Sequence, residues 1–185
     1  MKTNIVIRSI TLLAASATLC PAQLQDLPMG GKPLTVMTRN LYVGADFSPI
    51  VLALYQGSVA QVPGLVSAAY SQIVASDFPA RAKAIAAEIA TYHADLVGLQ
   101  EVSLIRTQFP GFLLTGQFTP AVDVAYDYLD ILLSELNQLG LHYTAVATAT
   151  NLDVELPNQT GMDVRLTDRD VILVRGDLPP GHLRL

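Results

Sequence analysis

Two polar residues stand just beyond short apolar stretches, each one residue after the stretch ends, and the composition of these stretches is typical of buried strands. Asn40 follows the stretch at residues 34–38, and Glu101 follows the stretch at residues 96–99. In open α/β sheets, ligands bind outside the carboxyl ends of the strands. There, an asparagine amide can orient a phosphate or a metal-bound water, and a glutamate can ligate a hard cation. The alternative is that both residues only mark where the chain returns to solvent.

Three aspartates are further candidates for the same chemistry. Asp168 and Asp170 alternate at the start of the apolar stretch 167–175, so they share one face of a strand and can share a cation. The alternative is an exposed strand start in which Arg165 pairs with one of the two carboxylates. Asp46 follows Asn40 closely enough to reach the same strand exit.

The elements that must position these residues follow from the apolar patterns along the chain. We expect strands at residues 34–38, 96–99, 142–148 and 167–175, and helices after the capping Asp77, at residues 122–139 and within residues 48–76, broken at Gly57 and near Pro63-Gly64. This order predicts an α/β sheet with helices on at least one face. The other face must also be covered, and little sequence remains to cover it. We therefore expect a missing partner or a missing half.

Three segments together resemble the endonuclease/exonuclease/phosphatase superfamily of metal-dependent phosphoesterases. Its first motif, a strand ending in Asn, is similar to Thr35-Val36-Met37-Thr38-Arg39-Asn40-Leu41. Its second, with a metal-binding Glu in a Gln-Glu pair, resembles Ala94-Asp95-Leu96-Val97-Gly98-Leu99-Gln100-Glu101-Val102. A later strand of the family is similar to residues 167–175. The three segments occur in the family's order.

The resemblance implies a partial four-layer α/β sandwich and hydrolysis of phosphoester bonds with Mg²⁺, or with Mn²⁺ or Ca²⁺. Glu101 is then the metal ligand, and Asn40 orients the substrate or a water. In such an enzyme the metal polarises a phosphoryl oxygen, while a His–Asp pair activates the water. The expected substrate is a nucleic acid or a lipid or small-molecule phosphodiester.

The sequence also departs from the family pattern in its later catalytic motifs. Tyr42 occupies a position where many members have Asp, and neither an Asp-x-Asn motif nor a late Asp-His pair is present. We expect structural roles for His93, His142 and His182. These departures predict a C-terminally incomplete domain with impaired hydrolysis. The alternative is a non-catalytic secreted binding module that keeps the half-fold and associates with itself through an uncovered sheet face.

The N-terminus has the pattern of an export signal. Lys2 and Arg8 precede an uncharged Ala/Leu-rich run, so we expect a signal peptide at residues 1–22, a linker at 23–33 and the domain at 34–185, in a secreted or periplasmic protein without a transmembrane segment after cleavage. Hydrophobic residues make up 51% and charged residues 15% of the chain, which is typical of a folded protein. Its formal net charge of -5 disfavours tight nucleic-acid binding.

Overall fold

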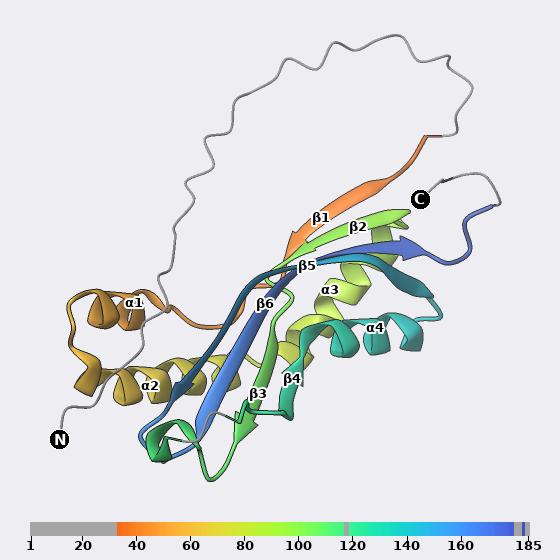
Figure 1. Ribbon diagram of the computed structural model, residues 1–185. Coiled ribbons are helices and arrows are strands. Elements are labelled where there is room, and N and C mark those ends of the chain that lie inside the picture. Colours follow the sequence, from red (N-terminus) through yellow and green to blue (C-terminus); the bar gives the residue numbers. More distant parts are fainter. Residues whose placement is uncertain (1–32, 117–118, 180–182, 184–185) are drawn as a thin grey trace, which may run out of the picture. The chain divides into compact units, whose positions relative to one another are not determined.

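The domain is a mixed α/β fold with a six-stranded mixed sheet and, in the part of the chain described, four α-helices (Figure 1). The computed structural model describes residues 33–116, 119–179 and 183. The expected signal peptide lies outside these residues, as does nearly all of the expected linker. The elements are β1 (Val36–Asn40), α1 (Ser48–Tyr55), a 3-10 turn η1 (Val59–Gln61), α2 (Val62–Ala75), α3 (Phe78–Tyr92), β2 (Leu96–Gln100), β3 (Leu104–Gln108), a second 3-10 turn η2 (Leu113–Thr115), β4 (Asp123–Asp127), α4 (Tyr128–Gln138), β5 (Tyr143–Pro157) and β6 (Asp163–Arg175).

Strand β6 organises the sheet because it pairs with three other strands. β5 runs antiparallel to it over its whole length, whereas β2 and β3 follow one another along the same partner strand. β1 lies parallel to β2, and β4 lies antiparallel to β3. The expected α/β sheet is therefore confirmed. Its parallel pair, β1 and β2, is the pair that carries the two candidate residues at their carboxyl ends.

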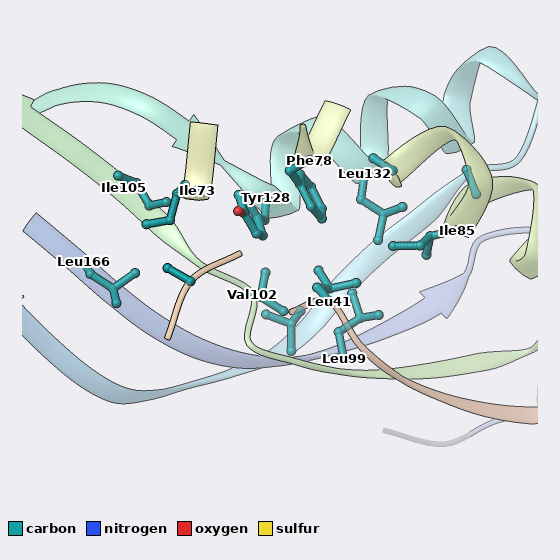
Figure 2. Packing of buried hydrophobic residues seen from close by; sticks show 14 of the residues in the cluster. Leu41, Ile73, Phe78, Ile85, Leu99, Val102, Ile105, Tyr128, Leu132 and Leu166 are labelled. Atoms are coloured by element: carbon teal, nitrogen blue, oxygen red, sulfur yellow. The ribbon is translucent and has the colours of Figure 1, made fainter. Parts of the chain in front are cut away.

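Helices α3 and α4 pack together and cover one face of the β2–β6 part of the sheet (Figure 1). As expected, Asp77 caps α3 by accepting a hydrogen bond from the Ala80 N–H at 3.2 Å. The rings of Phe78 and Tyr128 stack at 3.6 Å between the two helices, in the middle of the core (Figure 2). This core lies beneath the carboxyl ends of β1 and β2.

The opposite face of this part of the sheet is left open by the described elements. On β6, Val171 and Leu173 are buried, whereas Ile172 between them is 45% exposed. Alternate strand residues point to opposite faces, so one face is covered and the other is not. The expectation that a second half of the structure or a partner covers this face stays a prediction.

Several elements differ from the sequence expectations. The helix expected from residue 122 begins only at Tyr128, because Asp127 accepts the Leu129 N–H as an N-cap and the residues before it form β4. Pro63-Gly64 does not break the second helix but lies in the first turn of α2. The backbone N–H groups of this turn have no partner within the helix, so the missing N–H of proline costs nothing there. β3 was not expected, and the β5–β6 hairpin is much longer than the strands predicted.

No helix in the described ranges has both the length and the apolar character needed to cross a membrane.

Candidate functional site

The structure brings Asn40 and Glu101 together. The parallel register of β1 and β2 pairs Asn40 with Gln100, so the two strands end side by side at the same edge of the sheet. The Asn40 Nδ2 atom donates a hydrogen bond to Glu101 Oε1 at 2.8 Å. Sixty-one positions separate the two residues in the sequence. Their contact thus depends on the sheet and not on local chain geometry.

Glu101 owes its position to an irregularity between β2 and β3. Leu99 pairs with Val171, and Leu104 pairs with Thr167. This step spans five positions on the β2–β3 strand (104 − 99) but four on β6 (171 − 167), so one extra residue forms a bulge. Glu101 adopts a φ of 55°, which L-residues rarely adopt. Bulges and such strained residues are frequent next to functional sites, where they re-aim a side chain.

The loop after β1 folds around the Glu101 carboxylate. The Val43 N–H donates to Glu101 Oε2 at 2.8 Å, and the Tyr42 N–H donates to Asn40 Oδ1 at 2.7 Å. Tyr42, like Glu101, has a positive φ, at 56°. The carboxylate is therefore oriented through both oxygens by neutral donors.

Two residues that the sequence analysis did not select hold this loop in place. Arg81 donates to the carbonyl oxygens of Leu41 at 2.5 Å and Tyr42 at 3.1 Å, and the Tyr128 hydroxyl donates to the Val43 oxygen at 2.8 Å. One signal in the sequence does point to Arg81. An arginine close to a helix N-terminus is disfavoured by the helix dipole, so a compensating contact is expected there.

Glu101 and Asp168 line one pocket of about 360 Å³. The other lining residues are apolar or aromatic: Tyr42, Val43, Ala45, Phe47, Leu152 and Leu166. Asp168 accepts a hydrogen bond from Asn151 Nδ2 at 3.1 Å. No lysine, arginine or histidine is among the lining residues. The pocket therefore presents two carboxylates against an otherwise apolar wall.

The other two aspartates lie outside this pocket. Asp170 is exposed on β6 and is absent from its lining. Asp46 lies beside the pocket, where its Oδ1 accepts the Ser48 N–H at 2.8 Å at the start of α1. The hydrogen bonds from Ser48 hold the pKa of the Asp46 carboxyl below its usual value. The position of Asp46 is thus accounted for by this hydrogen bond to the first residue of α1.

Two of the histidines lie at the other end of the strands. His93 ends α3 with a φ of 46°, before β2 begins, and its carbonyl oxygen accepts a hydrogen bond from Arg175 at 2.6 Å. The His142 ring contacts Asn137 Oδ1 at 3.1 Å, just before β5. Both are exposed and neither lines the pocket. His182 lies outside the described residues.

The donor set fits a hard divalent cation that keeps most of its water. Among the described residues, no basic side chain forms an ion pair with Glu101. A carboxylate has about four lone-pair sites, and hydrogen bonds occupy only two of those on Glu101. The described part of the chain contains no group of three or more His, Cys, Asp or Glu residues able to hold a metal ion. Mg²⁺ is commonly held by one or two carboxylates, water and substrate phosphate, and Glu101 and Asp168 match this description.

Comparison of the chain with protein-family models, with curated proteins and with solved structures found no match. The geometry of the site is therefore the basis for its function. That geometry consists of a carboxylate oriented by neutral donors, an adjacent amide, and a second carboxylate across a small pocket.

Proposed function

We propose that this protein binds phosphoesters through a divalent cation and is of the endonuclease/exonuclease/phosphatase type, with impaired hydrolysis. The observation that carries the proposal is the 2.8 Å contact between Asn40 and Glu101 at the exits of two parallel strands. Two residues selected for their separate chemistry meet where α/β sheets bind ligands.

Each residue of the site has a role in this proposal. Glu101 holds Mg²⁺, Mn²⁺ or Ca²⁺, and Asp168 approaches the same ion from across the pocket. Asn40 keeps the carboxylate oriented and presents its amide to a phosphate or a water. The bound cation supplies the positive charge that a phosphate requires. That supply matters here because the pocket lining contains no basic residue.

The expected weakness of hydrolysis follows from the choice of general base. In the described residues no histidine reaches the pocket, and Asp168 is the only ionisable lining group besides Glu101 and Tyr42. Histidine is the side chain that most often accepts the proton of an attacking water, and the described pocket lining contains none. Binding without rapid turnover is therefore the expected behaviour.

We also propose that the domain is part of a four-layer α/β sandwich. A four-layer sandwich consists of two sheets packed face to face between helices. The described domain supplies one sheet, with α3 and α4 on one face and Ile172 exposed on the other. We assign this open face as the surface that the second sheet would cover. The proposed location, after export by the N-terminal segment, is outside the cytoplasm.

Calorimetric titration of the full chain with Mg²⁺ and Mn²⁺ tests the proposal. Glu101→Gln should weaken binding by more than about tenfold, because the amide removes the charge and one oxygen ligand. The matched control is Glu88→Gln, which changes a surface glutamate paired with Arg39 at 3.4 Å and should leave the affinity unchanged. Equal affinities of the two variants would overturn the proposal.

Turnover of bis(4-nitrophenyl) phosphate separates the proposed function from the non-catalytic alternative. Slow, Mg²⁺-dependent hydrolysis that Glu101→Gln abolishes would support an impaired hydrolase. Mg²⁺ binding without any hydrolysis would favour a binding module on the same half-fold, for which the open face around Ile172 is the observation in support.

A further inference from the structure

A second, larger hollow borders the candidate site and shares two lining residues with it. It measures about 840 Å³ and runs along α1, and it shares Ala45 and Phe47 with the pocket that contains Glu101. Its remaining lining residues are Asp46, Ser48, Pro49, Val51, Leu52 and Tyr55. A molecule that places a phosphate beside Glu101 can therefore extend along α1.

The helix that borders this hollow is apolar and exposed. Val51 is 64% exposed, Leu52 54% and Tyr55 89%. Between Asp46 and Asp77 the sequence contains no charged residue at all, so α1, η1 and α2 are uncharged throughout. Contiguous exposed apolar side chains on a soluble domain mark an interaction surface.

The charge of this surface decides which phosphoester fits it. A nucleic acid requires lysine or arginine side chains to neutralise its backbone, and neither hollow is lined by any. A phospholipid combines one phosphate with long apolar chains, and the site offers a cation ligand beside an apolar surface in that same order. The absence of basic residues also predicts no preference for anionic lipid, in contrast to most interfacial helices.

We propose that α1 docks on the surface of a zwitterionic phospholipid layer and delivers the head-group phosphate to the Glu101 pocket. The side chains of Val51 and Leu52 enter the apolar region, and the aromatic ring of Tyr55 lies at the level of the head groups. This inference rests on the proposed function for its substrate class. The docking surface itself consists of different residues and can be tested alone.

The test is flotation of the full chain with phosphatidylcholine vesicles in the presence of Mg²⁺. Val51→Asp and Tyr55→Ser should each lower the fraction bound, Val51→Asp by roughly tenfold or more in the partition coefficient. The matched controls are Val74→Asp on α2 and Tyr92→Ser on α3. They make the same chemical changes at residues that are 46% and 62% exposed and line neither hollow, so they should bind like the unchanged protein.

Three results would overturn the inference: no flotation with saturating phosphatidylcholine, flotation only with anionic vesicles, or equal losses in Val51→Asp and Val74→Asp. Because all four positions are exposed, misfolding is not expected, and circular dichroism verifies this for each variant.

Binding of dimethyl phosphate separates failure of this inference from failure of the proposed function. This short diester cannot reach α1, so its Mg²⁺-dependent binding should be lost in Glu101→Gln and kept in Val51→Asp. If both variants keep diester binding and the unchanged protein still floats with vesicles, the lipid-docking surface is supported and the phosphoester site at Glu101 is overturned. If diester binding depends on Glu101 but the protein does not float with vesicles, the phosphoester site is supported and the lipid-docking surface is overturned.

Discussion

The two ends of β2 each carry a carboxylate, but the two are held in opposite ways. Asp95 precedes the strand, is only 6% exposed, and forms an ion pair with Arg175 at 3.0 Å while accepting the Thr35 N–H at 2.8 Å. Glu101 follows the strand and is half-buried, and among the described residues its carboxylate accepts hydrogen bonds only from the neutral donors Asn40 and Val43. One charge is balanced within the fold, and the other is oriented but not balanced.

This difference separates an acid that holds the structure from an acid that is available to a ligand. A buried carboxylate with an arginine partner stabilises the fold only as a pair, since the removal of either partner leaves an uncompensated charge. An oriented carboxylate without a cationic partner keeps its negative charge for a cation from solution. Substitution of each carboxylate in turn tests this difference.

The largest effect is expected for Asp95→Ala. This change leaves Arg175 without its buried partner and the Thr35 N–H without its acceptor, so we expect a loss of about 3–5 kcal/mol in the free energy of unfolding. Urea denaturation measures it. The control is Asp177→Ala, which removes the second, 79% exposed partner of Arg175 and should cost less than about 1 kcal/mol. Similar losses in both variants would contradict the assignment of Asp95 as the structural partner.

The next effect is stabilisation by the cation itself. At a Mg²⁺ concentration about 100-fold above its dissociation constant, the unchanged protein should gain about 2.7 kcal/mol in unfolding free energy. The Asp95→Ala variant should gain the same increment although it starts from lower stability, and Glu101→Gln should gain none. Denaturation with and without Mg²⁺ gives all three values. A gain by Glu101→Gln would place the cation elsewhere.

A smaller effect is expected at Arg81, which acts on Glu101 only through the loop. Arg81→Met keeps the aliphatic stem but removes the hydrogen bonds to the Leu41 and Tyr42 oxygens. Positioning residues of this kind typically change metal affinity by about tenfold, or about 1.4 kcal/mol. Calorimetric titration with Mn²⁺ measures the change, with Arg39→Met as a control on the surface. Unchanged affinity would show that the loop does not need Arg81.

The sequence predicts the part of the site that depends on strand order. Asn40 and Glu101 each follow an apolar stretch, and parallel pairing of those stretches is enough to bring them together. The sequence likewise predicts the start of α3, because the capping Asp77 and Pro79 both lie at the first turn of that helix. Such features are local, or they depend on one pairing only.

The rest depends on contacts between distant segments. The bulge at Glu101 exists only because β2 and β3 share β6 as a partner, and the support of the loop comes from α3 and α4. The sequence also places an acid at each end of β2 without indicating which one has a cationic partner. The cationic partner of Asp95 is Arg175, which lies 80 positions further along the chain (175 − 95).

The smallest effect concerns Asp153, a carboxylate that has an arginine partner like Asp95 but is partly exposed like Glu101. Asp153 has an arginine partner, Arg165 at 2.5 Å, but its side chain is 37% exposed. The hydrogen bond from Arg165 lowers the pKa of Asp153 below its ordinary value of 3.8, and a further hydrogen bond from Thr167 acts in the same direction. Because the folded-state pKa is depressed, the stabilisation is present above the unfolded-state pKa and is lost as the pH falls through the folded-state pKa. Solvent screening limits it to less than about 1 kcal/mol.

Asp153→Asn should therefore lower the unfolding free energy slightly at neutral pH, and its difference from the unchanged protein should vanish as the pH falls through the folded-state pKa of Asp153. Urea denaturation of both proteins across this range provides the measurement. A loss at neutral pH as large as that of Asp95→Ala would mean that the ion pair, and not its burial, makes an acid structural in this fold. The contrast between the two ends of β2 would then have to be explained by the arginine partner alone.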